Sequence, residues 1–226
     1  MTHQSRIKNN SFWQKYQFYF LLLAALIIRQ IPVVSLPLNW LESYFHEMSH
    51  GIAALVTGGQ IISIQLFANG AGLCTTQGGI SVIISFFGYA GATLWGWLIV
   101  NIAKSHQRTA QIFSAVMLCF LLLSILFWVR DLLTIIIVSS LAIMFFVTIK
   151  LQRLQYLQML VKFFGLSILL NSLLSPTYLF DGRSLGDGAA LATMTFIPEF
   201  IWVIIWCGLA IMALYQLMRA NRKRSL

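Results

Sequence analysis

Two histidines four residues apart, His46 and His50, lie in a long apolar stretch with Glu47 between them. On a helix, residues four apart face the same side, so both imidazoles can bind one metal ion. A glutamate at the second position of this His-Glu-x-x-His pattern is placed to act as a general base. We therefore predict that His46 and His50 bind Zn²⁺ and that Glu47 accepts a proton from an attacking water.

The elements that carry these residues are predicted to be membrane helices. Hydrophobic residues make up 59% of the 226 residues and charged residues 9%, whereas soluble domains carry about 25% charged residues. Seven apolar stretches have lengths near the roughly 20 residues that cross a bilayer: 17–36, 38–57, 80–103, 110–129, 132–149, 156–175 and 198–218. The sequence thus predicts an all-α polytopic membrane protein with about six to seven transmembrane helices. If one of these seven stretches is re-entrant and does not cross the bilayer, we expect it to be the first, because Arg29 interrupts its end.

The domain prediction is one integral membrane domain over 1–226, with a polar interfacial segment at 1–16 and a basic tail at 219–226. The formal net charge is +9, and the basic residues gather at the two ends and in short loops between apolar stretches. This distribution is typical of contacts with lipid headgroups. We expect the lipid bilayer as a partner, in a bacterial cytoplasmic membrane, and no binding of nucleic acid.

Residues 60–78 differ from the apolar stretches on either side of them. Ile62, Ile64 and Leu66 alternate with polar residues, as in a strand, and Asn69-Gly70 is a strong turn signal. We predict a short β-hairpin or β-loop at about 60–78, with a polar connecting loop as the alternative. An edge strand in this position would allow an extended peptide to bind by strand addition.

A catalytic zinc site usually has three protein ligands and an open position for water. The chain has six acidic residues, and Glu47 is assigned as the base. Glu42 lies one turn before His46 on the same helix, which suits an entrance or supporting role better than a ligand. Elimination of the other acids leaves Asp181 and Asp187, both in a Gly-rich stretch after the sixth apolar segment.

At this point the sequence resembles the site-2 protease class of intramembrane zinc metallopeptidases. His46-Glu47-Met48-Ser49-His50 followed by Thr57-Gly58-Gly59 looks like the metal helix of that class and its exit. The Gly-rich segment 60–79 is similar to the β-element beside its active site. The compact branch without a PDZ domain carries an Asp followed by Leu-Ala, Thr, Pro and Trp, and this spacing is matched here by Asp187, Leu191-Ala192, Thr195, Pro198 and Trp202.

The resemblance favours Asp187 as the third ligand. Asp181 is the alternative, in a looser match of Asn171, Pro176 and Asp181-Gly182 to the Asn-Pro and Asp-Gly motif of the class. We expect Asn171 to hydrogen-bond the developing oxyanion. The implied function is zinc-dependent hydrolysis of peptide bonds in a transmembrane or membrane-proximal protein substrate. Two alternatives remain open: a non-proteolytic membrane protein that binds or transports a metal, and an inactive protease-like scaffold.

Overall fold

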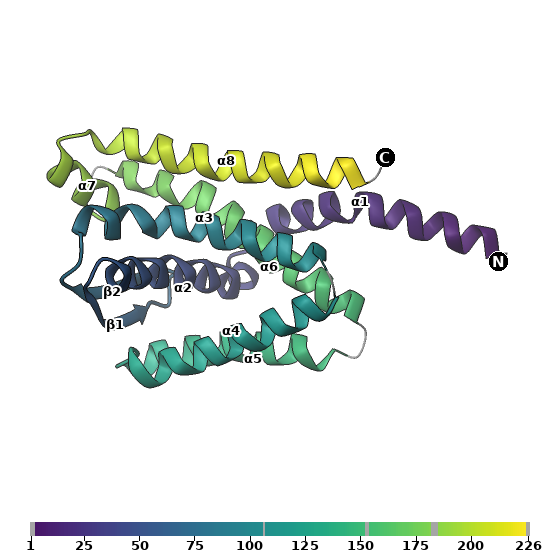
Figure 1. The fold of residues 1–226 in the computed structure, drawn as a ribbon, viewed down its shortest axis with the longest axis horizontal. Helices are drawn as coiled ribbons and strands as arrows, with labels where there is room; N and C mark the ends of the chain where they lie inside the picture. The colour runs from purple at the N-terminus through teal and green to yellow at the C-terminus, as the bar shows by residue number, and fades with distance from the viewer. Residues whose placement is uncertain (1–2, 106, 152–153, 182–184, 225–226) are drawn as a thin grey trace.

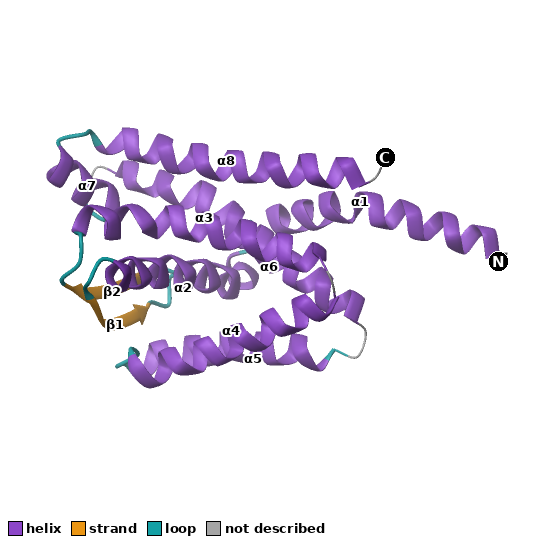
Figure 2. Cartoon of the chain, viewed as in Figure 1, coloured by secondary structure: helices purple, strands orange, loops and turns teal. Residues whose placement is uncertain are grey.

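The computed structural model of the chain describes residues 3–105, 107–151, 154–181 and 185–224. Within these ranges the protein is largely helical, and its two strands form one small antiparallel sheet (Figures 1 and 2). The elements in chain order are α1 (His3–Arg29), α2 (Pro32–Val56), β1 (Gln60–Leu66), β2 (Gly72–Gln77), α3 (Ser81–Ser105), α4 (Gln107–Phe127), α5 (Leu132–Lys150), α6 (Leu154–Leu174), the 3-10 helix η1 (Ser175–Asp181), α7 (Asp187–Thr195) and α8 (Glu199–Arg224).

The predicted polytopic helical fold is confirmed. Over the described residues, five helices are long and apolar enough to cross a bilayer: Ser81–Ser105, Arg108–Phe127, Leu132–Lys150, Gln155–Leu179 and Glu199–Arg222. A sixth candidate is the pair Tyr16–Arg29 and Pro32–Val56, which passes the same test only together and is bent by 111°. This count lies at the lower end of the expected range because the first two apolar stretches join in one bent pair.

The bend between α1 and α2 falls where Arg29 interrupts the apolar sequence. Pro32 occupies the start of α2, and Ile31 before it has extended backbone. Proline suits the first turn of a helix because that turn has no use for its missing N–H. Pro37 lies inside the helix. The helix therefore begins six residues before the predicted apolar stretch 38–57.

The predicted hairpin is present and rests on α2. Its strands pair in antiparallel register, with Ile64 opposite Cys74 and Leu66 opposite Gly72. At the turn, Gly70 adopts a positive φ of 89°, which glycine accepts without strain. The indole of Trp40 on α2 donates to the Phe67 carbonyl at 3.0 Å. This contact helps to fix the hairpin over the middle of α2.

Helix α2 runs between two groups of helices (Figure 1). On one side lie α3, α6 and α8; on the other lies the pair α4 and α5. The Tyr44 hydroxyl of α2 is hydrogen-bonded to Ser124 of α4 at 2.6 Å, and both groups are buried. On the opposite side, Trp206 of α8 donates to the Phe86 carbonyl of α3 at 3.0 Å. The middle of α2, which carries the two histidines, is therefore packed between these groups of helices.

Candidate metal centre

His46 and His50 project from α2 toward α3 and α7, as the helical spacing predicted. Both belong to a single turn of α2, and the Nε2 atoms of their rings are 3.0 Å apart. His50 is buried, with 7% of its surface exposed. Two nitrogen lone pairs that meet at this distance repel each other unless a proton or a cation lies between them. The pair is therefore poised to share a positively charged partner.

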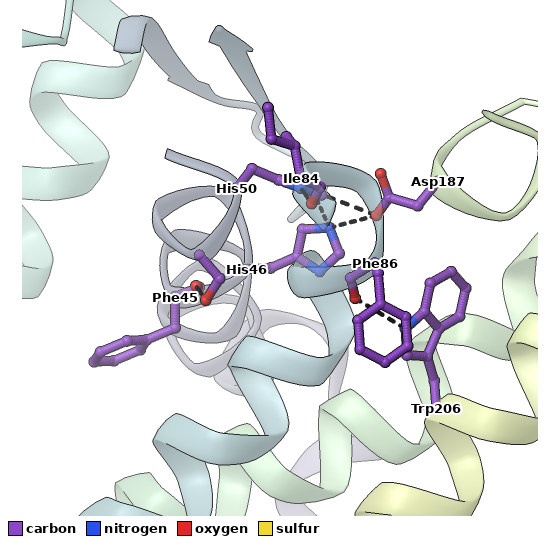
Figure 3. A network of polar contacts seen from close by, with 8 residues as sticks. Phe45, His46, His50, Ile84, Phe86, Asp187 and Trp206 are labelled. Carbon is purple, nitrogen blue, oxygen red and sulfur yellow. Dashed lines mark hydrogen bonds and ion pairs between the residues drawn. The ribbon is translucent and has the colours of Figure 1, made fainter. Parts of the chain in front are cut away.

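Asp187 brings a carboxylate to the same point (Figure 3). Its Oδ2 atom lies 3.1 Å from Nε2 of His46 and 3.3 Å from Nε2 of His50. In a tetrahedral site with bonds of about 2.0–2.1 Å, ligand atoms stand roughly 3.3–3.4 Å apart. The three donor atoms thus have nearly the spacing of three corners of such a tetrahedron. Together they could hold one metal ion.

The orientation of His50 is fixed by a second contact. Its Nδ1 atom lies 2.7 Å from the carbonyl oxygen of Ile84 on α3. A carbonyl only accepts, so Nδ1 carries the proton and the lone pair of the neutral ring is at Nε2. A hydrogen bond of this kind orients a metal-binding histidine and raises its basicity. His46 is held differently, by the ring of Tyr89, whose centroid is 4.4 Å from that of the imidazole.

Helix α3 approaches the two imidazoles closely because residue 88 is glycine. A Cβ atom at Gly88 would lie 2.5 Å from Cε1 of His50 and 2.7 Å from Cε1 of His46. Such distances leave no room for a methyl group. Gly88 therefore lets α3 pack directly against the histidine pair.

Asp187 is the first residue of α7, directly after Gly186, whose φ is 92°. Burial by itself would raise the pKa of the Asp187 carboxyl, but the adjacent imidazoles of His50 and His46 outweigh burial and hold it well below its usual range. The carboxylate is therefore ionised, as a metal ligand must be. Asp181, the alternative ligand, ends η1, and its side chain lies outside the described part of the structure.

Glu47 points toward the hairpin. It is 6% exposed and accepts a hydrogen bond from the backbone N–H of Cys74 on β2. A Cβ at Gly72 would lie 2.6 Å from Oε1 of Glu47, so this strand can pass the carboxylate only with glycine there. Burial and the nearby Glu47 raise the pKa of the Cys74 thiol to about 12. Cys74 is thus a neutral thiol at physiological pH and no thiolate ligand.

Asn171 is buried on α6, and its hydrogen bonds run away from the histidines. Its Oδ1 accepts from the guanidinium of Arg29, and its Nδ2 donates to Oδ1 of Asn39 at 3.1 Å. Asn171 nevertheless lines the same cavity as His46 and Asp187. That cavity has a volume of about 1060 Å³ and extends from the histidines toward the start of α2. Its described charged lining residues are Arg29, Glu42, Glu47 and Asp187.

Sequence reasoning missed three residues that shape this site: Gly72 and Arg29, which line the cavity, and Gly88, which faces the two imidazoles. Neither glycine has a local sequence signal, because its importance depends on which side chain lies opposite. Arg29 carried a signal, since a cation at the end of an apolar stretch is expensive to place in a membrane. We had interpreted it only as an interruption of the first stretch.

Comparison with known proteins assigns the chain to a family. The searches of curated proteins and of solved structures find no match. The family model described as Peptidase M50B-like matches residues 19–217. That range contains α2, the hairpin and Asp187, and the predicted resemblance is confirmed. The chain therefore belongs to the Peptidase M50B-like family, the site-2 protease family of membrane metallopeptidases.

Proposed function

We propose that this protein is a zinc-dependent endopeptidase that hydrolyses peptide bonds within or next to the bilayer. The observation that carries the proposal is the convergence of Nε2 of His46, Nε2 of His50 and Oδ2 of Asp187 within 3.3 Å of one another. Two imidazoles and one carboxylate are a donor set typical of catalytic zinc, which keeps a fourth position open. Substrates would be transmembrane or membrane-proximal proteins.

His46, His50 and Asp187 are the residues that would hold the ion. When bound, Zn²⁺ would supply Lewis acidity, which polarises the scissile carbonyl and makes water easier to deprotonate. Glu47 accepts the proton of the attacking water and then donates it to the leaving amine. The hydrogen bond from the Cys74 N–H keeps the Glu47 carboxylate in one orientation during both transfers.

Asn171 remains our candidate for stabilising the developing oxyanion. Its amide has one N–H beyond the one given to Asn39, and the side chain lines the cavity. A donor that is already held in place by other bonds loses little entropy when it binds a new charge. The substitution Asn171→Ala would remove this donor and is expected to lower kcat more than it raises KM.

The hairpin offers an edge for an unwound substrate. The N–H groups of Ile64 and Leu66 bond outward to the Trp128 carbonyl and the Thr134 hydroxyl, at 3.0 and 2.9 Å. Paired residues of an antiparallel ladder turn their backbone groups the same way, both inward or both outward. Cys74 and Gly72, opposite these residues, therefore direct their backbone groups away from β1 and toward Glu47. An extended peptide added at this edge would lie beside the base.

The proposal is tested with purified protein and the variant Glu47→Gln. Bound zinc is measured by atomic absorption, and cleavage is measured with a labelled transmembrane peptide in detergent. We expect zinc in both proteins and cleavage by the unmodified protein alone. Full activity in Glu47→Gln would contradict the mechanism. Zinc uptake into proteoliposomes without any cleavage would favour metal transport, and zinc binding with neither activity would favour a scaffold.

A further inference from the structure

The cavity continues past the histidines along α2. Glu42 lies one turn before His46, and Asn39 lies almost one turn before Glu42, so the line of polar residues points back toward the start of the helix. The four residues from Glu42 to His46 rise about 6 Å along the helix axis. This part of the cavity, which we call the Arg29–Glu42 end, is lined by Arg29, Asn39, Glu42, Asn171 and Ser175. Apart from Asn171, the proposed oxyanion donor, none of these residues has a role in the proposed hydrolysis.

The guanidinium of Arg29 is held in place by Asn171, which is itself bonded to a second helix. It donates to Oδ1 of Asn171 on α6, and the Asn171 amide in turn donates to Asn39 on α2. This chain of bonds joins the last residue of α1 to α2 and α6 at the bend. A guanidinium has five N–H donors in a rigid fork, so one bond to Asn171 leaves others to serve a ligand.

Glu42 supplies an acceptor next to this donor. The residue is 6% exposed, and its Oε1 atom has no hydrogen-bond partner among the residues that the structure describes. Arg29 lies near enough to attract the carboxylate, and the Ser175 hydroxyl contacts it, but no described ion pair joins Arg29 to Glu42. A buried acceptor without a donor is unfavourable, and native proteins rarely keep one without a reason. Rotation about χ3 can turn either oxygen toward the cavity.

We propose that the Arg29–Glu42 end is a subsite for one residue of the unwound substrate, with Glu42 accepting its backbone N–H and Arg29 donating to its backbone C=O. In an extended chain the N–H and C=O of one residue point to the same side, so a donor and an acceptor side by side match them. A ligand of a single charge would be attracted by one of the two side chains and repelled by the other. The inference rests on the proposed peptidase function, because it assumes that an extended peptide enters the cavity.

The position of the subsite sets its distance from the scissile bond. An extended peptide advances about 3.3 Å per residue. The rise of about 6 Å between Glu42 and His46 then corresponds to about two substrate residues. A helix that unwinds in a membrane loses the internal partners of its N–H and C=O groups, which lipid cannot replace. The subsite would supply partners for one such residue and thereby favour the unwound form.

The test measures peptide binding rather than cleavage. Glu47→Gln protein loaded with zinc is titrated with a fluorescent transmembrane peptide that has a glycine-rich centre. A set of analogues replaces one backbone amide at a time by an ester, which removes a single N–H. The same titrations are made with Glu47→Gln protein that also carries Glu42→Met, which removes the acceptor, or Glu42→Gln, which keeps an acceptor oxygen. Arg29→Met is compared with Arg130→Met, an exposed arginine outside the cavity.

We expect one ester, about two residues from the cleavage site, to weaken binding about tenfold. Adding Glu42→Met should weaken binding of the all-amide peptide by a similar factor and should abolish the effect of that ester. Glu42→Gln should restore part of the binding. Arg29→Met should weaken binding and Arg130→Met should not. Equal ester effects with and without Glu42→Met would overturn the proposal. Loss of zinc from the Glu42→Met protein would also overturn it. So would a binding affinity that depends on a Lys or Asp side chain of the substrate instead of on its backbone. If the expected binding pattern occurs but unmodified protein never cleaves the peptide, the proposed activity fails and the subsite stands.

Discussion

The two ends of the cavity are built in opposite ways. At the metal end, three donor atoms converge within 3.3 Å, and His50 is further held by the Ile84 carbonyl. At the Arg29–Glu42 end, the guanidinium is fixed by Asn171, but the Glu42 acceptor is left without a partner. A small ion needs a rigid set of ligands that is complete before it arrives. An extended substrate needs groups that stay unsatisfied until it binds, so the difference is the one expected between the proposed metal ligands and the proposed substrate subsite.

The largest effect at the metal end is expected from removal of the proposed third ligand. Asp187→Ala deletes the carboxylate that lies 3.1 Å from His46 and 3.3 Å from His50. We expect zinc affinity to fall by orders of magnitude, beyond the roughly 10- to 100-fold typical of a residue outside the coordination sphere. Asp181→Ala is the matched control, and affinity is measured by competition with a chelator. A larger loss in Asp181→Ala would make Asp181 the ligand.

The next effect separates the base from the metal. In Gly72→Ala, the new methyl group would meet Oε1 of Glu47 at 2.6 Å and displace the carboxylate. We expect kcat to fall about 100-fold, the scale of a lost general base, with zinc content unchanged. Gly208→Ala is the control, since a Cβ there meets nothing within 4 Å. Unchanged kcat in Gly72→Ala would show that the position of the Glu47 carboxylate does not depend on the close approach of β2.

A smaller effect on the metal end is expected from the helix that faces it. Gly88→Ala would place a methyl group 2.5 Å from Cε1 of His50 and push both rings from their positions. Because the ligands themselves remain, we expect zinc affinity to fall only about 10- to 100-fold. Gly208→Ala again serves as control, with the same chelator competition. Wild-type affinity in Gly88→Ala would mean that α3 can move away without disturbing the site.

Much of this structure could be predicted from local sequence. The spacing of His46 and His50 is a property of one helical turn, and Asn69-Gly70 specifies its turn within a few residues. The boundary between α1 and α2 was harder, because Pro32 and Pro37 both suit a helix start and only packing decides between them. The third ligand was harder still. Elimination left Asp181 and Asp187 open, since α7 must fold back onto α2 and α3 before either acid can approach the histidines.

The same limit applies to what the sequence missed. Gly72 on β2 leaves room for Glu47, and Gly88 on α3 leaves room for the two histidine rings. In both cases the facing side chain comes from another element, α2. Arg29 and Glu42 are 13 positions apart in the chain and come together only because the helix bends between them. A local sequence pattern predicts the type of an element, but it does not show which side chains of other elements lie opposite it.

One turn of α3 links the position of the metal ligands to their proton chemistry. The Ile84 carbonyl receives the proton-bearing nitrogen of His50, and Gly88, the residue four positions later, makes the space for both rings. In a regular helix the Ile84 carbonyl is also the acceptor for the Gly88 N–H. A sliding of α3 past α2 would therefore alter the tautomer-fixing bond and the clearance at once. Any displacement of this turn of α3 would thus change the position and the basicity of His50 together.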